Sequence, residues 1–345
     1  MGNTMKALRK SKPERGLWLE EVDIPEVQPG WVLLKVLRTS ICGTDLHIYK
    51  WDHWSQNRIK IPRTIGHEFV GEVVDVGEGV FRVKVGDIVT AETHIVCGVC
   101  EFCRTGRAHV CKNTKILGVD IDGTYADYVV VSADNLIHVK DVPLEIASIM
   151  EPFGNAVHTV MESPIRAKTV AVLGSGPIGN MAIALAKAFG ASLVIATDIK
   201  PFRLELASKM GADVTINVLE EDLYERVMEL TGGRGVDTVL EMSGAPSALR
   251  DALKIVVPEG HVTILGIPSD DVPLDVANGI VMKGITVRGI IGRRMYETWY
   301  QTVSILERGI VDLSPIITHV ISLSKYEEGF KALFDGKAGK VVMIP

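Results

Sequence analysis

Residues 40–49, SICGTDLHIY, place a thiol, a hydroxyl, a carboxylate and an imidazole within one short segment. Cys42 could bind a metal as a thiolate, and Thr44 and His47 could carry a proton from a buried substrate to solvent. The segment directly follows the alternating apolar stretch 32–37, which predicts a strand. Its composition is typical of an active site, although a free buried cysteine beside a surface histidine is the plainer alternative.

A histidine and two glutamates extend this group of metal-binding side chains. His67 and Glu68 follow a glycine, and Glu151 lies in the segment MEPF. With Cys42 they offer one sulfur, one nitrogen and two oxygen donors, which are ligand types of a zinc ion that keeps an exchangeable position for catalysis. We expect Cys42, His67 and Glu68 to hold a catalytic zinc. Glu151 would be a fourth group that binds directly or through a water.

The other four cysteines form a compact knuckle, and they are Cys97, Cys100, Cys103 and Cys111. Four thiolates can enclose one tetrahedral ion and leave no open position, which predicts a structural zinc site. An iron–sulfur cluster and a redox thiol pair are the alternatives, but no proline follows Cys111 as it does in the bacterial ferredoxin run. Clustered cysteines of odd total number fit metal binding in a reducing compartment better than disulfides, so we expect a cytoplasmic protein.

Length and composition limit the classes of partner. A chain of 345 residues predicts about two domains. A hydrophobic content of 47% and a net charge of -6 give no sign of nucleic-acid or membrane binding. No apolar run is as long as a membrane span, and residues 1–12 are too polar for a secretory signal.

The first part of the chain is rich in short predicted strands. Segments such as 71–77 and 83–89 combine β-branched residues with Gly and Asp turns, which favours a twisted, barrel-like antiparallel domain. The last segment, 339–344, also reads as a strand and should return to this domain. We therefore expect a zinc-binding catalytic domain over 1–154, completed by 293–345, and an NAD-binding domain over 155–292.

The second domain carries a nucleotide fingerprint, GSGPIG, between a continuous apolar strand at 169–173 and a helix. Gly174 would form the tight turn, Gly176 would let the backbone approach a pyrophosphate, and Gly179 would let the helix pack on the strand. Alternating strands and helices predict a doubly wound parallel sheet. Its six expected strands are 169–173, 193–198, 213–216, 236–241, 261–266 and 285–290.

Two further features of this domain concern the cofactor. Asp198 ends the second strand, where it would accept hydrogen bonds from ribose hydroxyls and repel a 2′-phosphate, so we expect NAD rather than NADP. Lys200 and Arg203 lie nearby and keep NADP as an alternative. Ligands bind at the carboxyl ends of such strands. The residues expected to line the nicotinamide end are therefore Leu265, Gly266, Ile267, Ile290 and Ile291.

With these zinc and nucleotide motifs in this order, the chain resembles the zinc-dependent medium-chain dehydrogenases over essentially its whole length. The segments 48–56, 151–158, 297–300 and 314–319 resemble the polyol and threonine branch of that family. The resemblance implies an α/β fold, with a GroES-like β-rich catalytic domain and a Rossmann doubly wound parallel-sheet domain. No cysteine follows Cys111, so a carboxylate must replace the later cysteine ligand of the alcohol dehydrogenase branch.

The resemblance also implies an activity: oxidation of L-threonine by NAD to 2-amino-3-ketobutyrate, with two Zn²⁺ per chain and usually in a homotetramer. It implies that Thr44 and His47 relay the proton, and that Ile178, Asp198 and Arg203 contact NAD. His94 and Arg293 are candidates to bind the substrate carboxylate. A polyol or 2,3-butanediol dehydrogenase with the same sites is the nearest alternative, and a non-catalytic nucleotide-binding protein is a remote one.

Overall fold

The computed structural model describes residues 4–345 and divides into two compact units. Unit 1 comprises the chain up to Pro152 with Arg294–Glu307 and Ile317–Pro345, and unit 2 comprises Phe153–Arg293 and Arg308–Ile316. Residues 308–316 were expected in the first domain, but they belong to unit 2. Their short helix Ser314–Ile316 packs on helix α7 (Pro201–Lys209).

Unit 1 is built mainly from one seven-stranded sheet. Strand β3 (Trp31–Ser40) is its centre and pairs with β5 (Glu68–Val76), β9 (Tyr128–Ser132) and β18 (Lys340–Ile344), all antiparallel. The buried residues of β3 alternate along its first half, as expected for a strand with one face in a core. The sheet is completed by β6 (Ile88–Ala91), β10 (Leu136–His138) and β17 (Ile317–Ser322).

Smaller elements surround that sheet. Strands β1 (Thr4–Lys10), β2 (Trp18–Asp23) and β4 (Arg63–Thr64) form a second sheet, and β7 (His94–Ile95) pairs with β8 (Lys115–Ile116). The helices are α1 (Gly43–Lys50), α2 (His53–Arg58), α3 (Glu101–Arg104), α4 (Leu144–Ser148), α10 (Glu297–Glu307) and α11 (Tyr326–Phe334). Helix α5 (Met150–Met161) runs from unit 1 into unit 2.

The barrel-like prediction for unit 1 needs two corrections. Strands β17 and β18 run parallel, so the main sheet is mixed. Residues 83–87 form a turn rather than the start of a strand, because the Asp87 amide bonds the Lys84 carbonyl and Gly86 adopts a φ of +92°. Strand β6 therefore begins only at Ile88.

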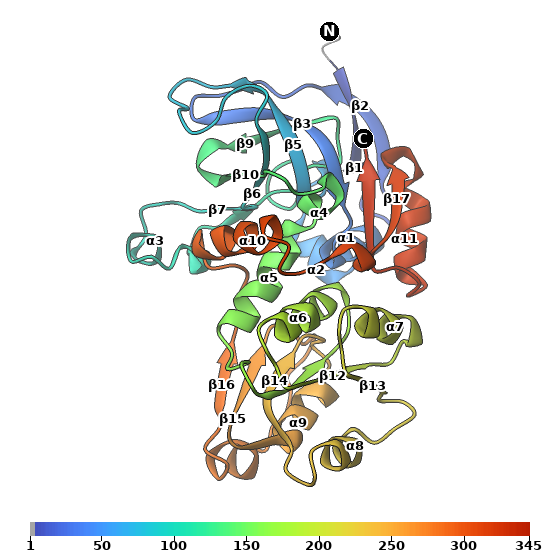
Figure 1. Ribbon diagram of the computed structural model, residues 1–345. Helices are drawn as coiled ribbons and strands as arrows, with labels where there is room; N and C mark the ends of the chain where they lie inside the picture. The colour runs from blue at the N-terminus through green and yellow to red at the C-terminus, as the bar shows by residue number, and fades with distance from the viewer. Residues whose placement is uncertain (1–3) are drawn as a thin grey trace. The chain divides into compact units, whose positions relative to one another are not determined.

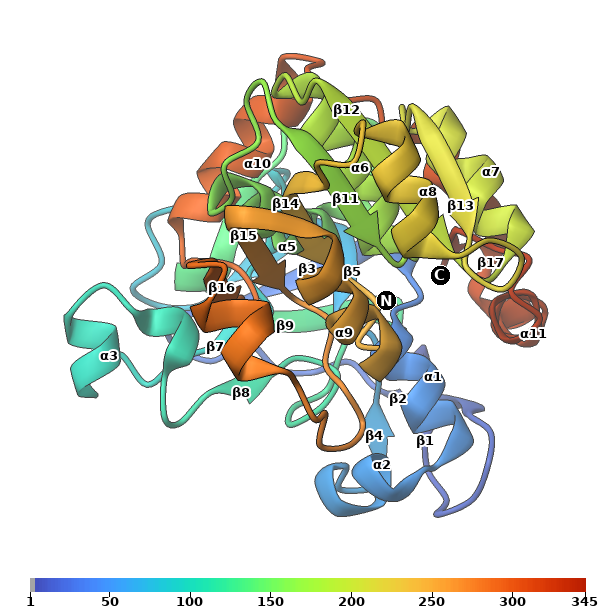
Figure 2. The same cartoon turned by 90° about the horizontal axis from the view of Figure 1, so that it is seen from below.

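Unit 2 confirms the predicted doubly wound α/β fold. Its six parallel strands lie in the order β13-β12-β11-β14-β15-β16 (Figure 2). Helices α6 and α7 lie on one side of this sheet, and α8 and α9 lie on the other (Figure 1). The strands are β11 (Thr169–Leu173), β12 (Leu193–Asp198), β13 (Val214–Asn217), β14 (Val236–Glu241), β15 (Val256–Ile264) and β16 (Thr286–Gly289). The helices not yet given are α6 (Pro177–Ala188), α8 (Leu223–Leu230) and α9 (Pro246–Ile255).

Burial on both faces explains why these strands are continuously apolar. Four of the five residues of β11 are buried, and every residue of β14 is buried. Helices α6, α7 and α9 each begin with a proline, whose fixed φ suits the first helical position. No helix within residues 4–345 is long and apolar enough to cross a membrane.

A buried carboxylate joins the two central strands of unit 2. Asp237 on β14 accepts hydrogen bonds from the backbone amide and the hydroxyl of Thr169 on β11, and Arg234 donates to it at 2.6 Å. Burial opposes its ionisation, but these hydrogen bonds outweigh that cost and hold the pKa of Asp237 well below its usual range. The carboxylate therefore stabilises unit 2 when it is ionised.

We predict that Asp237→Asn lowers the free energy of unfolding by about 1–3 kcal/mol at neutral pH. A group with a depressed pKa contributes stability above its unfolded pKa, so the loss should shrink as the pH falls below about 4, where the carboxylate of the unfolded chain takes up its proton before the native one does. Urea denaturation followed by circular dichroism at several pH values measures this. Asp270→Asn, on an exposed loop, is the control and should change little. An equal effect of Asp237→Asn at all pH values would contradict the assignment.

Candidate functional site

Three predicted zinc ligands lie together in unit 1. The ligand atoms of Cys42, His67 and Glu68 all lie within 4.8 Å of one another. Cys42 is the N-cap of α1, just after the end of β3, and Glu68 is the first residue of β5. Because β3 and β5 pair antiparallel with Ser40 opposite Glu68, the end of one strand meets the start of the other. Sheet register therefore brings the three donors together.

The electrostatics of this group favour a cation. His67 and Glu68 are both buried. Burial alone lowers the pKa of His67, but the negative groups Cys42, Asp45 and Glu151 outweigh it and raise the pKa of His67 to about 10. Burial raises the pKa of Glu68, and the ammonium of Lys340 opposes part of that rise. A proton on His67 thus offsets the negative charge that a bound metal ion would offset. Metal binding must displace this proton.

Unpartnered buried atoms test whether zinc fits. Nδ1 of His67 and Oε1 of Glu68 are buried and have no hydrogen-bond partner. Such atoms are costly unless a ligand satisfies them. Thiolate, imidazole and carboxylate together suit Zn²⁺ better than Mg²⁺ or Ca²⁺, which prefer oxygen alone. The three residues therefore fit a zinc ion.

Asp45, the carboxylate of residues 40–49, has a supporting role that was not predicted. It is fully buried on α1, and its Oδ2 accepts from the Cys42 amide at 2.9 Å and from the Tyr125 hydroxyl at 2.6 Å. Its Oδ1 lies 4.0 Å from Nδ1 of His67. Asp45 therefore acts on His67 through its charge, which helps to raise the pKa of His67. The only signal in the sequence was the helix-capping pattern, in which Asp45 stands three residues after Cys42.

Glu151 lies near this group but outside it. Its side chain is buried in the first turn of α5, and its Oε1 accepts from the Thr93 hydroxyl at 3.5 Å. It influences His67 electrostatically, yet its oxygens are not among the donor atoms that lie within 4.8 Å of one another. Binding of Glu151 to zinc, directly or through a water, therefore stays a prediction. The Thr93 hydroxyl helps to fix the position of its carboxylate.

Thr44 and His47 lie on α1 at a spacing that puts them on one helical face. The Thr44 hydroxyl is 3.8 Å from the Cys42 sulfur. The His47 side chain is 60% exposed, and its Nδ1 lies 2.5 Å from Oδ2 of Asp52. Burial opposes ionisation of Asp52, but hydrogen bonds from Ser55 and His47 hold its pKa below the usual value. The proton relay through Thr44 and His47 stays a prediction, with His47 on the exposed side of α1.

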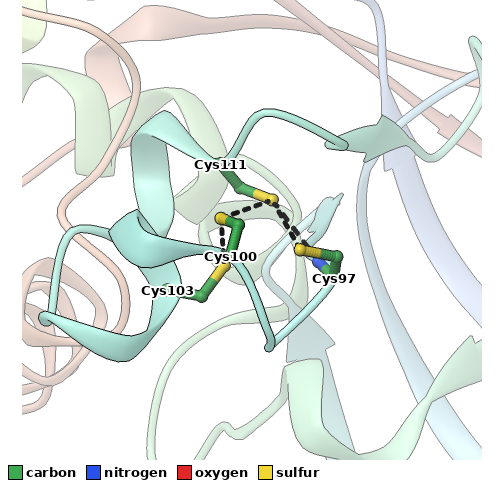
Figure 3. Close-up of side chains that lie close together, drawn as sticks. All are labelled: Cys97, Cys100, Cys103 and Cys111. Carbon is green, nitrogen blue, oxygen red and sulfur yellow. Dashed lines mark hydrogen bonds between the residues drawn. The ribbon is translucent and has the colours of Figure 1, made fainter.

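The cysteine knuckle is the second metal-binding group, in the loop between β7 and β8 (Figure 3). Its sulfur atoms are separated by 3.5 Å for Cys97 and Cys111, 3.5 Å for Cys100 and Cys103, and 3.9 Å for Cys100 and Cys111. Zinc–sulfur bonds of about 2.3 Å in a tetrahedron predict separations of about 3.8 Å. A disulfide would need about 2 Å. All four cysteines are free, so the knuckle fits a single ion better than a thiol pair.

The thiols of the knuckle already differ in proton affinity. Hydrogen bonds from the amides of Cys103 and Lys112 lower the pKa of Cys100 to about 6. Burial and the neighbouring sulfurs raise the pKa of Cys103 to about 12. Such a cluster cannot hold four thiolates unless a cation neutralises them. Zinc supplies that charge, and four ligands leave no position for a substrate.

The fingerprint glycines of unit 2 have distinct steric roles. A Cβ on Gly179 would lie 1.9 Å from the Gly174 carbonyl oxygen, and one on Gly174, which has a φ of +99°, would lie 2.6 Å from Cβ of Ser243. A Cβ on Gly176 would meet nothing within 4 Å, which leaves open space beside the N-terminus of α6. Ile178 lies in the first turn of that helix. The geometry fits a tight turn whose middle glycine admits a phosphate.

Asp198 lies at the predicted position at the end of β12. Its carboxylate accepts from the amides of Ser175, Ile199 and Lys200 at 3.0, 2.8 and 3.0 Å, and it lies 3.5 Å from Arg203. It lines a cavity of about 260 Å³ together with Gly174, Arg203 and Asp251. Asp198 thus fixes the glycine turn and also faces a space for the adenosine end of a dinucleotide.

The residues predicted for the nicotinamide end lie in the expected loops. The amides of Leu265 and Gly266, which follow β15, bond the Glu241 carbonyl. A Cβ on Gly266 would lie 2.1 Å from the Gly244 amide nitrogen, so the loop requires glycine. Ile290 and Ile291 follow β16, and the exposed fractions of Ile267 and Ile291 are 90% and 61%. These exposed apolar side chains are available to a ligand.

The two candidates for binding the substrate carboxylate differ in setting. His94 belongs to unit 1, where its Nδ1 lies 2.8 Å from Oε1 of the buried Glu92. The indole of Trp299 donates to the other oxygen of Glu92 at 2.7 Å. Arg293 belongs to unit 2, is only 1% exposed and donates to Asn155. His94 therefore shares a unit with the catalytic donors.

Comparisons with known proteins identify the family of this chain. Residues 28–141 match the alcohol dehydrogenase GroES-like domain, and residues 177–308 match the zinc-binding dehydrogenase domain. The chain is 51% identical to the L-threonine 3-dehydrogenase of Caldanaerobacter subterraneus over 347 residues, covering 100% of both chains. The chain belongs to the zinc-dependent medium-chain dehydrogenase family.

Two further relatives place the chain within this dehydrogenase family. The L-threonine 3-dehydrogenase of Pyrococcus horikoshii is 51% identical and is matched over 100% of this chain and 99% of that protein. The crystal structure of 2R,3R-butanediol dehydrogenase from Bacillus subtilis has a TM-score of 0.89 at 32% identity, with 99% of each chain covered. The fold is thus shared by dehydrogenases of different named substrates, whereas the higher identity is to the threonine enzymes.

We predict that Cys103→Ser, which removes one of four thiolates, lowers the zinc content from about two ions per chain to about one. The unclamped loop should then be cut faster by trypsin at Arg104 and Arg107. Elemental analysis and timed proteolysis measure the two effects. Cys42→Ser is the matched control: it should also lose zinc but leave the loop resistant. A Cys103→Ser protein that keeps both ions would contradict a structural site.

We predict that Asp198→Asn lowers kcat/KM for NAD about tenfold, or ~1.4 kcal/mol, and raises the relative use of NADP. The change removes the charge that repels a 2′-phosphate, while an amide oxygen still accepts from the neighbouring backbone amides. Steady-state kinetics with both cofactors measure the ratio. Asp251→Asn, which lines the same cavity, should leave the preference unchanged. An unaltered NAD to NADP ratio in Asp198→Asn would remove Asp198 as its determinant.

Proposed function

We propose that this chain is an NAD-dependent zinc dehydrogenase that oxidises L-threonine to 2-amino-3-ketobutyrate. The carrying observation is the full-length identity of 51% to L-threonine 3-dehydrogenases. The grouped donors of Cys42, His67 and Glu68 and the fingerprint of unit 2 support it chemically. On this proposal, unit 1 is the catalytic domain and unit 2 binds NAD.

The residues of this chain divide the work of alcohol oxidation. A bound zinc would lower the pKa of the substrate alcohol, as it does that of water. Cys42, His67 and Glu68 hold that ion, and Glu151 binds beside it directly or through a water. Thr44 accepts the proton of the alcohol and passes it to His47, which the carboxylate of Asp52 orients. Bound NAD would supply the hydride acceptor for the substrate carbon.

The remaining contacts determine cofactor and substrate. Gly174, Gly176, Ile178 and Gly179 hold the pyrophosphate, and Asp198 and Arg203 bind the adenosine ribose. The nicotinamide contacts are Leu265, Gly266, Ile267, Ile290 and Ile291. Threonine carries a carboxylate that a simple diol lacks, and His94, fixed by Glu92, is suited to bind it. Arg293 is less suited, because it is buried against Asn155 within unit 2.

A 2,3-butanediol dehydrogenase is the second candidate. The structural likeness to the enzyme of Bacillus subtilis, with a TM-score of 0.89, favours it. Both activities would use the same zinc and NAD chemistry, so only the substrate pocket distinguishes them. The lower identity of 32% makes it the weaker candidate.

We further propose that the protein works as a cytoplasmic homotetramer. Five free cysteines, four of them in a metal-binding knuckle, need a reducing compartment to keep their thiols. The tetramer follows from the family resemblance, and light scattering of the purified protein measures it directly.

We predict that the zinc-loaded protein forms NADH with L-threonine and not with 2,3-butanediol, and that a chelator which strips the catalytic zinc abolishes the reaction. NADH absorbance measures the rate, and re-addition of zinc should restore it. The structural ion, enclosed by four thiolates, should leave more slowly. Activity with the diol alone would keep the mechanism and move the substrate to the second candidate. A protein that holds two zinc ions but oxidises neither compound would contradict the proposed function.

A further inference from the structure

Glu68 forms an ion pair with Lys340, a residue that is not among the predicted metal ligands. Lys340, the first residue of β18, is 2% exposed, and its ammonium donates to Oε2 of Glu68 and, at 2.8 Å, to the carbonyl of Ile41. The hydroxyl of Ser40 donates to the same Oε2. Oε1 of Glu68 has no hydrogen-bond partner. One carboxylate oxygen therefore has two donors, and the other is the one available to a metal ion.

Sheet register explains how a residue near the end of the chain reaches this point. Strand β18 pairs antiparallel with β3, with Val342 opposite Ser40, and the Ile41 amide continues the ladder by bonding the Val341 carbonyl at 3.0 Å. One more step places Lys340 opposite Cys42. Strand β3 also pairs with β5, where Ser40 lies opposite Glu68. Three adjacent strands thus converge on the candidate catalytic donors.

The charge of the buried group calls for this lysine. A thiolate at Cys42 with carboxylates at Asp45, Glu68 and Glu151 carries four negative charges, and a divalent ion neutralises only two. Buried charges are expensive unless they are paired and hydrogen-bonded. Lys340 supplies a further positive charge without using a position on the metal. Lys10 is another fully buried lysine of unit 1, but its ammonium donates to the carbonyls of Glu14 and Gly16 and lies over the rings of Trp18 and Trp51.

We propose that Lys340, assisted by Ser40, is a positioning residue for the catalytic metal: it fixes Oε2 of Glu68, presents Oε1 as the ligand and offsets part of the negative charge of the site. This inference rests on the proposed zinc chemistry of Cys42, His67 and Glu68. It concerns metal affinity and coordination, so it holds or fails without reference to the substrate.

The test compares Lys340→Met, Lys340→Arg and Ser40→Ala with Lys10→Met, which removes a buried lysine away from the donors. Zinc affinity is measured on the full chain by competition with a chromogenic chelator, and the knuckle ion serves as an internal reference. Cobalt is then substituted, because its visible spectrum reports thiolate binding and coordination number. Removing a group that orients a metal ligand typically weakens the metal about 10–100-fold.

We expect Lys340→Met to weaken the catalytic site by about that factor and to alter its cobalt spectrum. Lys340→Arg should restore most of the affinity, Ser40→Ala should cause a smaller loss of the same kind, and Lys10→Met should leave both sites as they are. Wild-type affinity and spectrum in Lys340→Met would overturn the proposal. If that variant does not fold, an unchanged site in Ser40→Ala overturns it. Wild-type protein that binds both metals but leaves threonine unoxidised contradicts only the proposed function.

Discussion

Negative side chains that must stay close together in a buried place impose the main constraint on unit 1. The donors of Cys42, His67 and Glu68 lie within 4.8 Å, and repulsion and lost hydration would separate them without a positive partner. The raised pKa of His67, about 10, records that constraint, because a proton is retained there against the effect of burial. A bound zinc would relieve it by replacing the proton, and the pairing of β3 with β5 holds the donors together.

The knuckle also gathers negative side chains that need a cation, but there the ion cannot take part in catalysis. Four sulfurs at separations of 3.5 to 3.9 Å complete a tetrahedron, so the ion has no position for a substrate. At the catalytic group, three protein donors leave at least one position on the ion open. Glu151 lies close enough to influence His67 but outside the grouped donors, which suits a ligand that exchanges with water or substrate. The number of thiolate ligands, more than the identity of the metal, therefore distinguishes the structural site from the catalytic site.

Local motifs and the ligand types of the catalytic group were predictable from the sequence, but the supporting contacts that depend on strand register were not. The knuckle and the fingerprint each lie within one turn or loop, so spacing alone identified Cys97, Gly174 and their neighbours. The strands of unit 2 were located because burial on both faces makes them continuously apolar. Lys340 and Asp45 escaped notice because a lysine at a strand start and an aspartate in a helix look exposed until the pairing of β18, β3 and β5 is known. Residues 308–316 were assigned to the first domain because only their packing on α7 shows that they belong to unit 2.

Asp198 illustrates how one carboxylate can serve fold and cofactor choice together. Its hydrogen bonds to the amides of Ser175, Ile199 and Lys200 close the turn around the fingerprint, so its position is fixed before any ligand arrives. A fixed carboxylate repels a 2′-phosphate more effectively than a mobile one, which could rotate away. Arg203, at 3.5 Å, offsets part of that charge and is the residue through which NADP could still be admitted. On the proposed roles of Asp198 and Arg203, cofactor selectivity is a balance between two neighbouring charges, and the backbone hydrogen bonds of Asp198 favour NAD.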